Sequence, residues 1–439
     1  TATPHPIGPA RRRPTADRTG SPGCLSPFGA GPAPSAHERP ASASVRAVRL
    51  SDSRAEARFR AELAAWLDEN GPAPDRATDP PRSPGHIPRW ARIWQRTLFE
   101  AGWLVPRWPP ELGGRDATAV EQLIYLEELS RRRLPRTTNP LGLDVCAPTL
   151  ADHGDEVQRE EWLPRTLRGE MSWCLAVADQ VPEEGAGGVP PARGGAGAVV
   201  VAEERDGVLR LRGALPAPAG AEDADRCLCV VRREAGAEDD GAPTAVAVDL
   251  AAPGVTRPTP EAPVLVLDDV AVGEHDVVGG LDGGWPVVRG VRARLRSLRW
   301  ITGLLAVERA VEALAEVGQV RGLADDGVFR DTLAGLRVEA DAVRALAYRA
   351  LAKQDAGRPN PELTMLPLAT ARARERVYHA GLEALGADGL DMGLEGPEGW
   401  PGGSWASEWT ATLAEQAAAG GLAAERERVA GRLLGRHLR

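Results

Sequence analysis

Three groups of residues in this sequence could bind a ligand or catalyse a reaction, judged by their residue types and spacing. Cys227 and Cys229 stand two positions apart in RCLCVVRR, so both would face one side of a strand, where two thiolates could bind a metal ion. The glycine-rich segment from Gly185 to Gly197 could surround a phosphate group with backbone amides. Glutamates on helical segments, such as Glu308 and Glu425, could act as general bases. The sequence around each group decides whether a metal site, a phosphate site or a general base is predicted there.

The sequence around the first two groups supports neither a metal site nor a phosphate loop. A thiolate metal site needs further ligands, and none stands near Cys227 and Cys229 at a suitable spacing. We therefore expect both cysteines to pack in the core. The segment from Gly185 to Gly197 lacks the strand-glycine-helix context and a following Lys-Ser/Thr pair, which favours a flexible loop. The sequence thus predicts no metal site.

Composition argues against several classes of protein. The chain has 439 residues, a formal net charge of -9 and a pI of about 5.5, which argues against binding to nucleic acid. No apolar run approaches about 18 residues, so we expect no membrane span, and we expect no signal peptide. The five cysteines are odd in number and scattered, which predicts a reduced, cytoplasmic protein without a disulfide framework.

The apolar pattern divides the chain into four parts. Residues 1–45 are rich in Pro, Ala, Ser, Gly and Arg without apolar periodicity, which predicts a disordered tail. Helical spacing predicts a helical domain over residues 46–170, and short β-branched runs predict a β domain over residues 171–284. Long periodic segments predict a four-helix bundle over residues 285–439. The four helices are expected at Val288 to Val320, Phe329 to Gln354, Leu363 to Leu385 and Trp405 to Leu434.

The stretch from Ala147 to Leu175, APTLADHGDEVQREEWLPRTLRGEMSWCL, lies where the helical pattern gives way to strands. It resembles the acyl-CoA dehydrogenase family, in which a segment with PTL, HG, (F/W)LP and LRGE precedes a flavin-facing strand that begins with WC. FEAGWLVPRWPPELGGRD, the following helix with EELSR, and VLDDVAVGEHDVVGGLDGGW resemble further segments of that family. The resemblance implies an α+β fold with an N-terminal helical domain, a middle antiparallel β domain and a C-terminal helical bundle.

The resemblance also implies a chemistry, and the flavin-contact motifs can be compared with it residue by residue. Enzymes of this family remove the α-proton of an acyl thioester with a glutamate and pass the β-hydride to N5 of FAD. In the family, a residue whose hydroxyl group contacts the flavin follows the strand that begins with WC. In this sequence Ala178, which follows Val177, occupies that position. In a second flavin motif, Leu215, Ala217 and Ala219 replace a lysine, a tryptophan and a hydroxyl residue.

The catalytic base of the family occupies one of two positions, and neither carries a carboxylate in this sequence. In one branch the base is a glutamate directly before an arginine on the first long C-terminal helix, where this chain has Leu298 and Arg299. In the other branch it precedes a Gly-Thr pair near the C-terminus, where this chain has Gly420. We therefore assign no catalytic residue.

The adenosine side of the FAD site is only partly recognisable. EVGQVRGLADDGVFRDTL stands where the family holds the pyrophosphate and adenine across a subunit interface, but it lacks the family's Phe-Gly pair and the Gln that follows this pair. The helix end GLEALGADGL retains the resemblance. The FAD contacts that the resemblance implies are Val177, Ala178, Ala219, Glu383 and Gly386. We expect FAD to be bound weakly, to be shared with a partner chain, or to be absent.

Five other glutamates could replace the missing base, and they are Glu308, Glu312, Glu415, Glu425 and Glu427. The first two lie about three and four turns beyond Leu298 on the same predicted helix, which is farther than a carboxylate reaches. The other three lie on either side of Gly420, and in the arginine-rich segment that follows it such charges usually form a solvated ion-pair face. Neither group is predicted to supply a base.

Three hypotheses remain open at this point. The first is an FAD-dependent dehydrogenase of an acyl thioester, on CoA or on a carrier protein, whose flavin is reoxidised by an electron-transfer flavoprotein. The second is a non-catalytic subunit of a heteromeric dehydrogenase, which lends half of the cofactor site to a competent chain. The third is a flavin-free protein of this fold that binds an acyl thioester for another purpose. In each case we expect homo- or hetero-oligomers through the C-terminal helices.

Overall fold

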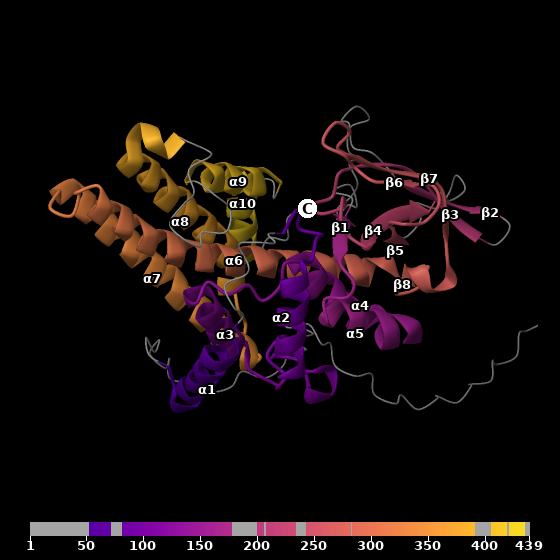
Figure 1. The fold of residues 1–439 in the computed structure, drawn as a ribbon, viewed down its shortest axis with the longest axis horizontal. Coiled ribbons are helices and arrows are strands. Elements are labelled where there is room, and N and C mark those ends of the chain that lie inside the picture. The colour runs from indigo at the N-terminus through magenta and orange to yellow at the C-terminus, as the bar shows by residue number, and fades with distance from the viewer. Residues whose placement is uncertain are drawn as a thin grey trace, which may run out of the picture.

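The computed structural model describes residues 52–71, 81–177, 200–205, 208–233, 243–281, 283–390, 405–418 and 421–434. The predicted disordered tail, the predicted glycine-rich loop and Ala178 lie outside these residues. Figure 1 shows a helical N-terminal part, a β domain in the middle of the chain and a set of long C-terminal helices, which is the predicted α+β architecture. None of the helices in the described ranges is long and apolar enough to cross a membrane.

The N-terminal part is built from helices, and capping boxes fix the starts of α1 and α3. Its α-helices are α1 (Arg54–Asn70), α2 (Arg89–Glu100), α3 (Ala119–Arg131), α4 (Ala147–His153) and α5 (Leu163–Leu167). At the start of α1, the Ser53 side chain accepts from the Glu56 amide while the Glu56 carboxylate accepts from the Ser53 amide. Thr118 and Glu121 repeat this arrangement at α3. The core between these helices includes Trp103, which is fully buried.

The β domain is one sheet with the strand order β6-β7-β3-β2-β4-β5-β8, and β1 pairs with β4 off this path. Its strands are β1 (Trp173–Val177), β2 (Val201–Arg205), β3 (Val208–Pro216), β4 (Arg226–Arg233), β5 (Pro243–Asp249), β6 (Val255–Thr256), β7 (Val264–Val272) and β8 (Val277–Val278). Most neighbouring strands are antiparallel, whereas β4 runs parallel to β1 and β2. Cys227 and Cys229 are buried in the core of this domain with their Sγ atoms 3.4 Å apart. Within the described residues, no group of three His, Cys, Asp or Glu side chains could hold a metal ion.

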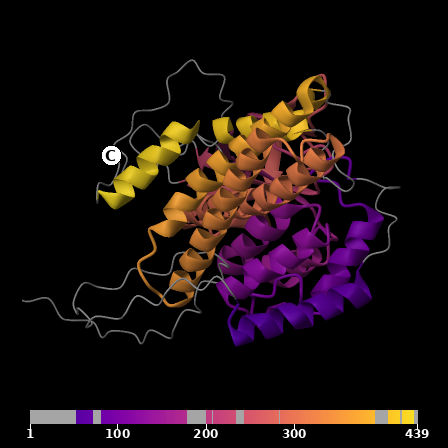
Figure 2. The same ribbon diagram turned by 90° about the vertical axis from the view of Figure 1, so that its left-hand side faces the viewer.

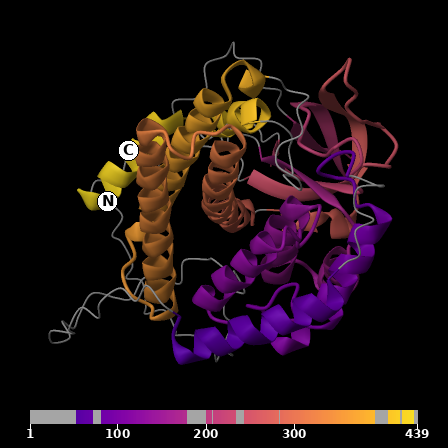
Figure 3. The same cartoon turned by 60° about the vertical axis from the view of Figure 1, so that its left-hand side comes forward.

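The C-terminal helices are α6 (Gly284–Val320), α7 (Gly327–Asp355), α8 (Glu362–Leu385), α9 (Trp405–Ala418) and α10 (Gly421–Leu433). The segment predicted as one helix from Trp405 to Leu434 therefore contains two helices. Figures 2 and 3 show α6 in the middle of the molecule, with the N-terminal helices on one side and the other C-terminal helices on another. Apolar residues of α3 share one core with α6, α7 and α8, so the two helical parts are packed together.

A buried asparagine joins the β domain to the N-terminal helices. The Asn139 amide group donates to the carbonyl oxygens of Pro84 (2.9 Å) and Trp173 (2.7 Å), and its carbonyl accepts from the Trp173 amide at 3.0 Å. Close to this joint, a Cβ atom on Gly85 would lie 2.0 Å from the carbonyl oxygen of Gly220, which itself has a φ of +85°. The start of β1 is thereby held against the loop that leads into α4.

Candidate active site

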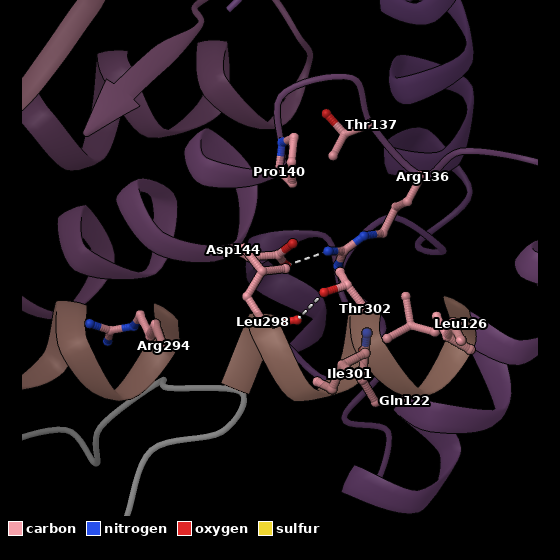
Figure 4. A pocket seen from close by; sticks show the side chains of 11 residues that line it. Gln122, Leu126, Arg136, Thr137, Pro140, Asp144, Arg294, Leu298, Ile301 and Thr302 are labelled. Carbon is pink, nitrogen blue, oxygen red and sulfur yellow. Dashed lines mark hydrogen bonds and ion pairs between the residues drawn. The ribbon is translucent and has the colours of Figure 1, made fainter. Parts of the chain in front are cut away.

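A cavity of about 150 Å³ lies between α3, α6 and the loop that leads into α4 (Figure 4). Its apolar wall consists of Leu126, Pro140, Leu298, Ile301 and Leu305. Its polar lining consists of Gln122, Arg136, Thr137, Asp144, Arg294 and Thr302. A dry cavity of about this volume holds a group the size of benzene, so this one could hold a short acyl chain.

The polar groups that face the cavity are engaged with one another. Arg136 donates to the carboxylate of Asp144, and both side chains are mostly buried. Burial alone would lower the pKa of Arg136, but the charge of Asp144 raises it above its usual value, so the guanidinium stays ionised. Thr302 donates its hydroxyl proton to the carbonyl oxygen of Leu298 at 2.8 Å. Asp144 is the one carboxylate among the described residues that line the cavity, and Arg136 neutralises it.

A second ion pair fixes how α6 is turned toward the cavity. The Arg294 guanidinium is paired with Asp152 of α4, and these side chains are only 3% and 5% exposed. Arg294 also donates to the Thr149 hydroxyl at 3.3 Å and to the Pro148 carbonyl at 3.4 Å. Because Leu298 lies one turn after Arg294 on the same helix face, this anchor also directs Leu298 toward the cavity.

Leu298, at the position the resemblance gives for the base in one branch, lines this cavity. Its side chain cannot accept a proton. Arg299 points to another face of α6, because successive residues of an α-helix are about 100° apart. There it lines a smaller cavity of about 50 Å³ that α6 shares with α8, α9 and α10. The structure therefore places an apolar side chain in the cavity wall at the position that the resemblance gives for the base.

Glu308 lies in a buried cluster of charges rather than in the wall of the cavity. It follows Leu305 by one turn of α6, and its carboxylate lies 3.4 Å from the Arg344 guanidinium. Glu127 lies in the same cluster, where it accepts from Arg344 at 2.8 Å and from the Tyr348 hydroxyl at 2.8 Å. Burial raises the pKa of Glu308 to about 7, and the charge of Glu127 adds to the shift.

Two of the three candidates near Gly420 line the smaller cavity, and Gly420 itself lies outside the described residues. Glu415 is exposed and pairs with Arg374 at 2.6 Å. Glu425 is buried and pairs with Arg428 at 2.5 Å. The structure thus brings these two glutamates together and engages each with an arginine. The other two candidates, Glu312 and Glu427, are exposed.

The described residues at the predicted flavin-ring positions do not fit a flavin ring. Leu215 is buried in the core of the β domain, and Ala219 is exposed in the turn after β3. Val177 ends β1 and pairs with Val230 of β4. These side chains offer neither an aromatic surface on which a flavin could stack nor a hydroxyl group that could bond to it.

The predicted adenosine contacts lie elsewhere in the fold. Glu383 and Gly386 lie at the C-terminal end of α8, with the Glu383 side chain 69% exposed. Figure 1 shows this end of α8 on the side of the molecule away from the sheet. It is tied to the α6–α7 turn by an ion pair of 2.6 Å between Arg321 and Asp388. The two halves of the predicted cofactor site therefore do not come together within one chain.

Comparison with known proteins explains this architecture. Residues 53–170 match the family model described as the N-terminal domain of acyl-CoA dehydrogenase, and residues 282–434 match the one described as its C-terminal domain. The chain belongs to the acyl-CoA dehydrogenase family. The resemblance seen in the sequence, the α+β fold that it implies and the prediction of an acyl-CoA dehydrogenase-like protein are thereby confirmed.

Individual relatives within the acyl-CoA dehydrogenase family are distant. Acyl-CoA dehydrogenase FadE34 of Mycobacterium tuberculosis is 29% identical over 307 residues, which are 67% of this chain and 41% of that protein. This chain thus spans about two fifths of the length of that relative. The structure entitled Tcur3481-Tcur3483 steroid ACAD has a TM-score of 0.69 at 22% identity and covers 88% of this chain and 99% of its own. The ChsE4-ChsE5 complex from Mycobacterium tuberculosis has a TM-score of 0.68 at 20% identity and covers 89% and 100%. At these identities the solved structures show a shared fold.

The sequence did not reveal the ion pairs of the cavity. Arg136 and Asp144 stand in a connecting segment without periodicity, and nothing in their spacing marks them as partners. Asp152 lies within the recognised PTL–HG segment, but its partner Arg294 is 142 positions further along the chain. Only the packing of α6 against α4 brings the second pair together.

Proposed function

We propose that this chain is the non-catalytic subunit of a heteromeric acyl-CoA dehydrogenase. The observation that carries the proposal is that Leu298, at the position that the resemblance gives for the family's base, lines the cavity. The alanine and leucine side chains at the flavin positions support it, because they could not hold a flavin ring unaided. In the assembly, a partner chain would supply the glutamate and most contacts to FAD. The assembly as a whole would carry out the α,β-dehydrogenation of an acyl thioester.

The names of two structural neighbours support an assembly of unlike chains. Each names two different polypeptides, Tcur3481 with Tcur3483 and ChsE4 with ChsE5. The separation of Val177 and Ala219 from Glu383 and Gly386 within one chain fits the same proposal, since a site divided in this way is completed only across an interface. The C-terminal end of α8 at Gly386, which keeps the family's motif, would then contact the adenosine of a cofactor held mainly by the partner.

One observation favours a second candidate, an active dehydrogenase with Glu308 as its base. A general base works best when its pKa is close to the working pH, and burial brings that of Glu308 to about 7. Against this candidate, Glu308 is not part of the cavity wall and is paired with Arg344. The two candidates predict different effects of removing glutamates from this chain.

The test is an activity measurement on the assembled protein. The chain is co-expressed with a homologue of the same genome that keeps the flavin and glutamate motifs, and acyl-CoA-dependent reduction of an electron acceptor is followed. Glu308→Gln, Glu415→Gln and Glu425→Gln in this chain are expected to leave turnover within about twofold of the parent complex. Glutamine at the base of the homologue is expected to lower turnover by at least about 100-fold, the lower end of what a general base contributes.

The pattern of these variants decides between the two candidates. A loss of about 100-fold in Glu308→Gln, with the base of the homologue dispensable, would contradict the proposal and identify this chain as the catalytic one. Ile93→Ala controls for effects of mutation and purification that do not involve either cavity. Ile93 is an exposed apolar residue on α2 that lines neither cavity. This variant is expected to behave as the parent complex does.

A further inference from the structure

Gln122 differs from the other polar residues that line the cavity of about 150 Å³ between α3 and α6. The residue is only 3% exposed, and Figure 4 shows its side chain extending from α3 toward α6 beside Ile301. Within the described residues, no group forms a hydrogen bond with the side-chain amide of Gln122. A buried amide without a partner is costly, so a ligand group that bonds to it would lower the free energy of the complex.

Each of the other polar side chains in this lining already has a partner within the chain. These side chains are Arg136, Thr137, Asp144, Arg294 and Thr302. The two arginines and the aspartate are held in ion pairs. Both threonine hydroxyls donate to oxygen atoms of the protein, at 2.8 Å in each case. Gln122 is therefore the polar side chain of the described lining that is left for a ligand.

The position of Gln122 decides which part of a ligand it can contact. Gln122 and Ile301 are 3% and 5% exposed, whereas Thr302 is exposed to solvent. All three line the same cavity, so its buried end lies at Gln122 and it reaches the surface near Thr302. Because a CoA thioester is too large for the cavity, its acyl group would enter with the end far from the sulfur first. That end would then meet Gln122.

The ion pair of Arg136 and Asp144 disfavours a charged acyl group. These side chains are 12% and 18% exposed, and their charges already neutralise each other. A carboxylate on the ligand would place a second negative charge beside one guanidinium group, and burying a charge without a partner of its own is costly. An uncharged carbonyl or hydroxyl group avoids this cost and can still bond to the Gln122 amide.

We propose that Gln122 makes this cavity selective for an acyl group that carries an uncharged hydrogen-bonding group, such as a ketone or a hydroxyl, at the end away from the thioester. The Gln122 amide would donate to the ketone oxygen, and the apolar wall would contact the methylene groups of the chain. Because the Leu298 side chain cannot accept a proton, this chain would hold the acyl group without oxidising it. The inference rests on the proposed function only in taking an acyl thioester as the ligand.

The test is isothermal titration calorimetry of the full chain with three CoA thioesters whose acyl groups have equal numbers of non-hydrogen atoms. Levulinyl-CoA has a ketone near the far end, isocaproyl-CoA has a methyl group in place of the ketone oxygen, and succinyl-CoA has a carboxylate. Levulinyl-CoA is expected to bind at least about fivefold more tightly than isocaproyl-CoA, because only the ketone satisfies the buried amide. Succinyl-CoA is expected to bind more weakly than levulinyl-CoA, because its carboxylate lacks a free counter-charge.

The variant Gln122→Met removes the amide and keeps the length and flexibility of the side chain. In this variant the affinity for levulinyl-CoA is expected to equal or fall below that for isocaproyl-CoA. Gln319→Met is the matched control, because it makes the same exchange at an exposed position of α6 that lines neither cavity. It is expected to keep the order of affinities of the parent chain. Circular dichroism of each variant confirms that the helices are retained.

The inference would be overturned by equal affinities of the parent chain for levulinyl-CoA and isocaproyl-CoA, or by tighter binding of succinyl-CoA than of levulinyl-CoA. A preference for levulinyl-CoA that persists in Gln122→Met would overturn it as well, and so would the absence of heat with all three thioesters at about 1 mM. The proposal of a non-catalytic subunit is judged separately, because it depends on turnover of the glutamate variants in the assembled complex and not on these affinities.

Discussion

Replacement of Asp152 by alanine is expected to lower the free energy of unfolding by about 3 to 5 kcal/mol, the usual effect of removing one partner of a buried ion pair. The Arg294 side chain is 3% exposed, so it could not be rehydrated without moving α6 away from α4. Its contacts with Thr149 and Pro148 are neutral and long, at 3.3 and 3.4 Å, and they would not replace the lost charge. Urea unfolding followed by tryptophan fluorescence measures the change.

Two further variants test whether the loss of stability in Asp152→Ala comes from leaving the Arg294 charge buried without its partner. Asp341→Ala removes an acid that pairs with Arg337 on the exposed face of α7, and it is expected to cost no more than about 1 kcal/mol. In Asp152→Leu/Arg294→Met both charges are gone, and stability is expected to recover relative to Asp152→Ala because apolar residues can replace a buried pair. A loss below about 1 kcal/mol in Asp152→Ala would show that Arg294 reaches water, contrary to the structure.

Glu308→Gln is expected to stabilise the protein at alkaline pH and to leave it unchanged in acid. In the folded chain burial and the charge of Glu127 raise the pKa of Glu308 to about 7, from a usual value of 4.5. A raised carboxyl pKa means that ionisation opposes folding. The cost is absent below about pH 4.5, grows between the two values and is complete above about pH 7. At pH 8.5 the glutamine variant should therefore gain about 2 to 3 kcal/mol.

The measurement is the free energy of unfolding of Glu308→Gln and the parent at several values between pH 4.5 and 8.5. Glu100→Gln, which changes an exposed glutamate at the end of α2, is the matched control and is expected to have the stability of the parent at pH 8.5. A Glu308→Gln protein that is less stable than the parent at pH 8.5 would mean that the contact with Arg344 outweighs the cost of burial. The proposed environment of Glu308 would then be wrong.

The fold could be predicted from the sequence because its segments carry local signals. The stretch from Ala147 to Leu175 combines a helical apolar spacing with the start of a strand, and the structure has α4, α5 and β1 there. The last predicted helix was less well defined. Apolar spacing continues through the segment from Trp405 to Leu434, and the structure describes two helices in it, with the second beginning at Gly421, where φ is +78°. A positive φ interrupts a helix without disturbing its apolar period.

The candidate site could be predicted only where it follows the family's own motifs. Leu298 is found in this way, because Arg299 marks its position, and the structure places it in the cavity wall. The environment of Glu308 could not be found, since Glu127 and its partner Arg344 are 217 positions apart and meet only when α3 packs against α7. No pattern within one helix encodes a pKa that depends on charges from two others.

We propose that this chain alone holds neither a flavin ring nor a base, and an absorption spectrum from 300 to 550 nm tests this proposal. The protein is purified alone, and again after co-expression with a homologue that keeps the flavin and glutamate motifs. We predict flavin bands only in the co-purified pair, and bleaching of these bands when an acyl-CoA is added. Stoichiometric flavin in the chain purified alone, bleached by an acyl-CoA, would contradict the claim and show that this chain is a complete dehydrogenase.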